Sequence, residues 1–158
     1  GTGSLSRATK VSNLEYQEVE RINYESVSYL CKSMRDFVSE SVLITGSVGE
    51  DAQFAGSAPY VMSKRSLRGF ARNFANEIYL KGVKCVYYLP GLIDAGMLSK
   101  LDETQINASL AAVNQSELTR AEDIAERMVL SVCRLKVQNV RISFEEKLTV
   151  IKDVYLNY

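Results

Sequence analysis

The sequence contains no histidine and no tryptophan among its 158 residues. The absence of histidine excludes a Ser-His-Asp or Cys-His catalytic arrangement, and any metal site with imidazole ligands, within this chain. Lysine plus arginine and aspartate plus glutamate each total 19, so the basic surplus typical of nucleic-acid-binding proteins is also absent. No apolar run approaches the roughly 20 residues that a membrane-spanning helix needs. We therefore expect neither a nucleic-acid nor a membrane partner.

The residues that are present have an ordinary globular composition. Hydrophobic residues make up 46% and charged residues 24%, which argues against a disordered or collagen-like chain. The length is that of one domain with one core. Cys31, Cys85 and Cys133 are odd in number and far apart in the sequence. We expect three reduced, mostly buried thiols and no metal site, in a protein of the cytoplasm or an organellar matrix.

Helical patterns and strand patterns alternate along the chain. Helices are expected over about 14–38, with a bend near Asn23, over 59–80, and from a capping box at 119–122. Strands are expected at 41–45, 83–89, 140–144 and 148–151, with residues 91–118 forming a loop that contains one or two short helical pieces. This alternation predicts an α/β fold with a parallel sheet and right-handed crossovers.

One group of residues is a candidate for chemistry. Tyr60 and Lys64 are four residues apart in a predicted helix, so their side chains share a face one turn apart. Taken alone, this spacing favours a solvated amphipathic helix, and only the neighbouring residues change that interpretation. Ser47 lies 13 residues before Tyr60, in a glycine-rich loop after a predicted strand, and Pro90-Gly91 follows the next strand. Because ligands bind at the carboxyl ends of parallel strands, we expect these groups to meet at one edge of the sheet.

With these motifs, the chain resembles the short-chain dehydrogenase/reductase family, and most closely its 3-oxoacyl-carrier-protein reductase branch. The matching segments are INYES (22–26), ITGSVG (44–49), APYVMSK (58–64), LPGLIDAGM (89–97), LDETQINASL (101–110) and LTRAEDIAERMVL (118–130). The resemblance implies a Rossmann-like, doubly wound fold and NADP or NAD as cofactor. It also implies reduction of a carbonyl, such as a 3-oxoacyl thioester of fatty acid biosynthesis, to an alcohol by hydride transfer.

The resemblance further implies a role for each residue of the group. Tyr60 would be the general acid that protonates the carbonyl oxygen. Lys64 would lower the pKa of Tyr60 by its charge and hold the nicotinamide ribose, while Ser47 would donate a hydrogen bond to the substrate oxygen. Asn23, at the expected helix bend, would hold a water that reprotonates Tyr60 through Lys64. Cofactor contacts are implied for Tyr60, Lys64, Pro90, Gly91 and Ile93.

The sequence also departs from the family. It lacks the glycine-rich turn that cradles the cofactor pyrophosphate and the residue that selects NAD or NADP. In the family register, Gly1 falls just after the fourth strand. We therefore expect residues 1–158 to form a single domain, the C-terminal catalytic half of a fold lacking its N-terminal βαβαβ half. We expect about three strands, an open edge at 41–45, and a marginally stable chain unless the missing half or a complementing chain joins it.

Two readings of function remain open. The chain is either half of an NAD(P)-dependent reductase, or a non-catalytic relic or oligomerisation module of the same fold that no longer binds nucleotide. Members of the family often pair through two long helices, here about 14–38 and 59–80. A homodimer or homotetramer is therefore expected under either reading, and a small-molecule or acyl-thioester carbonyl substrate under the first.

Overall fold

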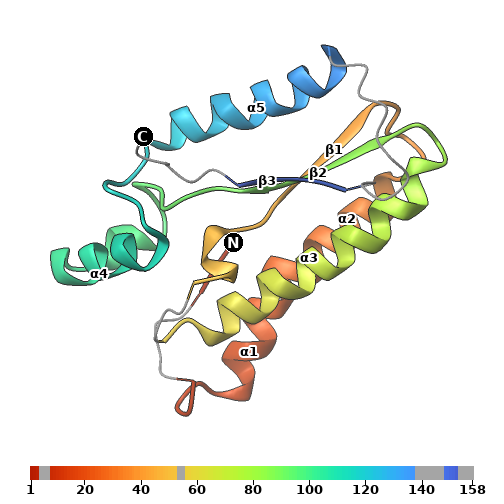
Figure 1. Cartoon of the computed structure of the whole chain (residues 1–158). Helices are drawn as coiled ribbons and strands as arrows, with labels where there is room; N and C mark the ends of the chain where they lie inside the picture. The colour runs from red at the N-terminus through yellow and green to blue at the C-terminus, as the bar shows by residue number, and fades with distance from the viewer. Residues whose placement is uncertain (4–7, 53–55, 138–147, 153–158) are drawn as a thin grey trace.

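The computed structural model describes residues 1–3, 8–52, 56–137 and 148–152 (Figure 1). In chain order its elements are α1 (Asn13–Glu20), the π-helical turn η1 (Arg21–Glu25), α2 (Ser26–Met34), β1 (Ser41–Thr45), the 3₁₀ turn η2 (Val48–Glu50), α3 (Ala58–Tyr79), β2 (Lys84–Leu89), the 3₁₀ turn η3 (Leu98–Lys100), α4 (Glu103–Val113), α5 (Ala121–Val137) and β3 (Leu148–Lys152). The predicted alternation of helices and strands is confirmed. The strand predicted at 140–144 lies outside the described residues.

The sheet has three parallel strands in the order β1-β2-β3. Ser41 pairs with Lys84, and Cys85 pairs with Leu148. In the described part of the chain, β1 pairs with β2 alone, so the predicted open edge lies at β1. Figure 1 shows α2 and α3 on one side of the sheet and α5 on the other. This layering explains why the 41–45 and 83–89 segments appear in the sequence as nearly continuous apolar runs.

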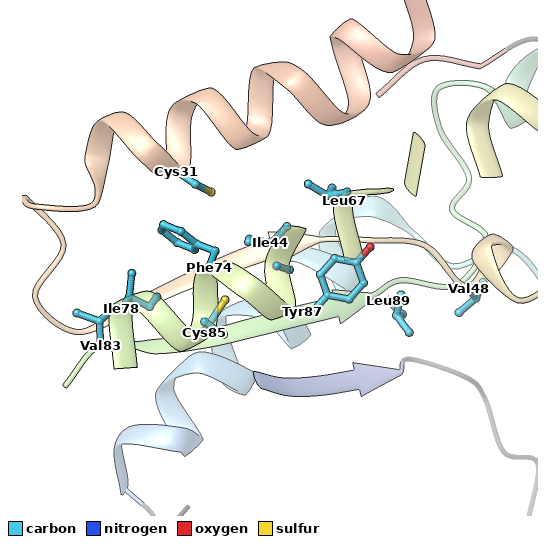
Figure 2. Packing of buried hydrophobic residues seen from close by; sticks show 12 residues of the cluster. Cys31, Ile44, Val48, Leu67, Phe74, Ile78, Val83, Cys85, Tyr87 and Leu89 are labelled. Carbon is cyan, nitrogen blue, oxygen red and sulfur yellow. The ribbon is translucent and has the colours of Figure 1, made fainter. Parts of the chain in front are cut away.

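The core lies between α3 and the sheet. Leu67, Phe74 and Ile78 come from one face of α3 and pack with Tyr87 of β2 in a single buried cluster. Figure 2 shows these side chains together, with Cys31 of α2 at the margin of the cluster. A period of about 3.6 residues along α3 thus meets a buried strand, and burial of this apolar surface holds the helix against the sheet.

Two local features of the backbone agree with the sequence. Gly82 has a φ of +75°, the left-handed conformation that favours glycine, and it ends the turn after α3. The expected bend near Asn23 is a π-helical turn, in which the α-helical hydrogen-bond pattern is interrupted over one turn. Asn23 is therefore placed at the break between α1 and α2.

The third helix begins one residue later than the capping box at 119–122 predicts. α5 begins at Ala121, and the first carbonyl to accept a helical bond belongs to Arg120, which bonds Ile124 N at 3.2 Å. The backbone N–H of Thr119 donates to Leu92 O at 3.0 Å and its backbone bridges to Ile93, so this N–H does not make the reciprocal bond of a capping box. This pairing ties the chain just before α5 to the loop after β2.

The cysteines lie as expected for structural thiols. Cys31 and Cys85 are buried, Cys133 is exposed, and all three are free. Burial raises the pKa of Cys85 to about 12, so that thiol stays protonated near neutral pH. Within the described residues, no helix is both long enough and apolar enough to cross a membrane, and no acidic or sulfur-containing cluster could hold a metal ion.

Candidate active site

The loops that follow β1 and β2 are joined at the carboxyl edge of the sheet. Gly46 N donates to Tyr88 O at 2.7 Å, and Val48 N donates to Pro90 O at 3.2 Å. A cavity of about 210 Å³ opens beside this junction. Its lining includes Ser47, Tyr60, Pro90, Gly91, Ile93 and Met97. The structure therefore brings together five of the seven residues that the sequence singled out, while Lys64 and Asn23 do not line this cavity.

Ser47 is held in a defined geometry. It precedes η2 with an extended backbone, and its Oγ accepts a hydrogen bond from Gly49 N at 3.1 Å. The Ser47 hydroxyl also interacts with the Tyr60 hydroxyl and lowers the pKa of that phenol. Gly49 N–H occupies one lone pair of Ser47 Oγ, so the single hydroxyl proton can be donated either to the Tyr60 oxygen or to a substrate oxygen in the cavity.

Tyr60 and Lys64 meet as their helical spacing predicts. Lys64 Nζ lies 5.9 Å from the centroid of the Tyr60 ring and donates to Thr45 O at 3.0 Å. Burial raises the pKa of Tyr60, a hydrogen bond with Ser47 lowers it, and the charge of Glu50 raises it again, with a net rise. The expected lowering by Lys64 is not found here, because removing the phenolate from water outweighs the favourable contacts. Burial also lowers the pKa of Lys64, and the charge of Glu50 opposes that change.

Asn23 reaches the site indirectly. Its side chain is buried, with Nδ2 donating to Thr2 O at 2.7 Å and to Ser63 Oγ at 3.1 Å, and Oδ1 accepting from Thr2 N at 2.8 Å. Ser63 Oγ in turn donates to Tyr60 O at 2.8 Å. Asn23 thus couples the π-helical turn to the first turns of α3. Its role in holding a water stays a prediction.

Sequence reasoning missed Glu50, which lies three residues after Ser47 and is completely buried. Glu50 Oε1 accepts from Ser47 N at 3.0 Å and from Tyr87 Oη at 2.5 Å, and Oε2 lies 3.9 Å from Arg68 Nη1. Burial raises the pKa of Glu50 and outweighs these contacts. The signal was present in the sequence, since Ser47 and Glu50 have the Ser-x-x-Glu spacing of a capping box.

Gln115 is a second residue that the sequence did not indicate. Its Oε1 accepts from Leu92 N at 2.8 Å, and its Nε2 donates to Leu92 O at 2.9 Å and to Glu117 O at 2.6 Å. This bidentate contact satisfies the backbone of the loop after β2 where no strand continues. It fixes the wall of the cavity next to Ile93.

Similarity to known proteins agrees with this arrangement. Residues 2–134 match a family model described as enoyl-(acyl carrier protein) reductase. The 3-oxoacyl-[acyl-carrier-protein] reductase of Buchnera aphidicola subsp. Schizaphis graminum is 29% identical over 123 residues, which cover 75% of this chain and 50% of the relative. The enzyme of that name from Salmonella typhimurium is 30% identical over 115 residues, covering 70% of this chain and 47% of the relative. The chain therefore spans about half the length of these curated relatives.

A solved structure shares the fold. A putative dehydrogenase from Burkholderia cenocepacia with bound NADP superposes with a TM-score of 0.76 at 17% sequence identity. The match covers 96% of this chain and 58% of that chain. The parallel sheet and its flanking helices are thus those of a Rossmann-like α/β fold, of which this chain forms a part.

Proposed function

Since this chain belongs to the short-chain dehydrogenase/reductase family, we propose that it is the catalytic half of an NAD(P)-dependent reductase that converts a carbonyl to an alcohol. One observation carries the proposal: Ser47 and Tyr60 line the same cavity, and the Lys64 ammonium lies 5.9 Å from the centroid of the Tyr60 ring. The proposed substrate class is a 3-oxoacyl thioester, because the reductases from Buchnera and Salmonella carry that description.

The described residues fit the nicotinamide end of NAD(P). Tyr60 and Lys64 offer a hydroxyl and an ammonium donor from one face of α3, which suits the vicinal hydroxyls of a ribose. The backbone at Pro90, Gly91 and Ile93 would form the wall against the nicotinamide ring. When bound, the reduced cofactor supplies the hydride. The other half of the fold, or a complementing chain, would bind its pyrophosphate and adenosine.

The residues of this chain would handle the substrate oxygen and its proton. Ser47 would donate a hydrogen bond that orients the carbonyl oxygen, and Tyr60 would transfer its phenolic proton as negative charge develops there. The raised pKa of Tyr60 suits this direction of reaction, because the phenol stays protonated until it is needed. Lys64, near the ring, would then help to return a proton to Tyr60.

We expect reductase activity when the chain is assembled with a nucleotide-binding half, for instance that of the Salmonella typhimurium relative, and when assembly is verified by co-purification. Consumption of NADPH or NADH should then depend on an acetoacetyl thioester. The alternative, a non-catalytic relic or oligomerisation module, predicts a different result. If the verified assembly binds neither cofactor in a fluorescence titration, the alternative replaces the reductase.

We also propose that the chain forms a homo-oligomer through the α2 side of the molecule. Large apolar side chains are exposed there: Tyr29, Leu30, Met34 and Phe37. Such a cluster on one surface typically marks a protein contact, and pairing of long helices is the usual arrangement in this family. The favoured partner is a second copy of this chain.

Leu30→Glu should therefore lower the oligomeric state, because it places a charge in the proposed interface. Leu30 is 61% exposed in the single chain, so folding of the chain itself should be unaffected. Sedimentation velocity measures the change. Val129→Glu is the matched control, since Val129 is 62% exposed on α5. A wild-type protein that sediments as a monomer, or a Leu30→Glu variant with unchanged mass, contradicts the proposal.

A further inference from the structure

Glu50 joins the loop after β1 and strand β2 at a single carboxylate oxygen. Oε1 accepts from the backbone N–H of Ser47 in the loop after β1 and from the hydroxyl of Tyr87 on β2. The Tyr87 hydroxyl also lies 3.0 Å from Lys64 O in α3. A short chain of polar contacts therefore connects the backbone of Ser47, through Glu50 and Tyr87, to the backbone of Lys64.

The packing around this carboxylate leaves little room for another arrangement. A Cβ at Gly46 would lie 2.6 Å from Glu50 Oε1 and 2.6 Å from Cε1 and Cζ of Tyr87. Gly46 is the residue directly before Ser47. The Glu50 carboxylate and the Tyr87 ring therefore pack closely against the backbone that leads into Ser47. A buried carboxylate is costly unless it is hydrogen-bonded, which indicates that these contacts define the local geometry.

The same turn is held from the α3 side as well. Arg65 Nε donates to Glu50 O at 2.8 Å, and Arg68 Nη1 lies 3.9 Å from Glu50 Oε2 and 3.5 Å from Asp51 Oδ1. The Glu50 backbone and side chain are thus both tied to the helix that carries Tyr60 and Lys64. Any shift of Glu50 would move Ser47 relative to that helix.

We propose that Glu50 is a positioning residue of the reductase site: acting through Ser47 N and Tyr87 Oη, it fixes the Ser47 hydroxyl relative to Tyr60 and Lys64. This inference rests on the proposed function. The reciprocal bond from Gly49 N to Ser47 Oγ depends on the same turn, so loss of the Glu50 side chain would release the Ser47 hydroxyl as well as its backbone. The hydrogen-bonding oxygen is the essential feature, because an amide oxygen can accept the same two bonds.

The first test is kinetic and uses the assembled protein with an acetoacetyl thioester. Glu50→Ala should lower kcat by about 10- to 100-fold, somewhat less than removal of a transition-state hydrogen-bond donor itself. KM should change little, since Glu50 does not line the cavity. Glu50→Gln should restore most of kcat, and Glu126→Ala, which removes an exposed acid on α5, should behave as wild type. A folded Glu50→Ala variant with wild-type kcat, or a Glu50→Gln variant as impaired as Glu50→Ala, would overturn the inference.

The second test needs no activity and separates this inference from the proposed function. Amide hydrogen exchange at Ser47 in the 158-residue chain should accelerate in Glu50→Ala and remain slow in Glu50→Gln. If the wild-type assembly reduces no carbonyl compound, the proposed function fails, and this exchange measurement still decides whether Glu50 fixes Ser47. If Glu50→Ala does not fold, Tyr87→Phe takes its place: faster exchange at Ser47 supports the inference, and unchanged exchange overturns it.

Discussion

Replacing Tyr60 with phenylalanine is expected to lower kcat for carbonyl reduction by about 10²- to 10⁴-fold, the range that a general acid contributes. The substitution removes only the hydroxyl, so the ring keeps its place in α3 near Lys64. Ser47 would still orient the substrate oxygen but would have no phenolic proton beside it. The effect should therefore fall on kcat more than on KM.

The measurement compares Tyr60→Phe with Tyr16→Phe, which loses the same atom from a partly exposed position on α1. Circular dichroism should show equal helix content for both variants. Because burial raises the pKa of Tyr60, the wild-type reduction rate should decline through Tyr60 ionisation only at alkaline pH. If Tyr60→Phe retains wild-type turnover, Tyr60 is not the general acid and the proposed mechanism is wrong.

Phe74→Ala is expected to reduce the free energy of unfolding by about 3–5 kcal/mol, as large-to-small substitutions of buried aromatic residues do. Phe74 is 2% exposed in the core cluster, and its ring stacks on Phe70 with centroids 5.4 Å apart. Truncation removes the stacking contact with Phe70 and the packing of the ring within the core cluster, and it leaves a cavity. A domain of ordinary stability has only about 5–15 kcal/mol in total, so this loss is a large part of it.

Urea unfolding followed by circular dichroism measures the change. Phe37→Ala is the matched control, because Phe37 is 79% exposed and its truncation should change the free energy of unfolding by less than about 0.5 kcal/mol in the separated chain. Phe74→Leu, which leaves a smaller cavity, should fall between the two. A loss below about 1 kcal/mol for Phe74→Ala would mean that the core tolerates the cavity by collapsing around it.

Much of the fold follows from local patterns. The apolar run at 41–45 predicts β1 exactly as the structure has it, and the 3.6-residue period over 59–80 predicts α3 to within a residue at each end. Both patterns are readable because a buried parallel strand and an amphipathic helix each leave a periodic record in the sequence. The capping signal at 119–122 also places the start of α5 to within a residue. It does not indicate the non-local bridge from Thr119 to Ile93, because that contact forms only in the folded chain.

Some features of the candidate site were likewise predictable from the sequence, and others required the tertiary structure. Spacing along the chain was enough to place Ser47, Tyr60 and Pro90 at one cavity, because the carboxyl ends of adjacent parallel strands meet at one edge of the sheet. The proposed role of Glu50 required the tertiary structure, because its contact with the Tyr87 hydroxyl forms only when β2 pairs beside β1. The direction of the Tyr60 pKa shift also required the folded chain. Burial and partners distant in sequence set a pKa, whereas the sequence records only which residues are near one another along the chain.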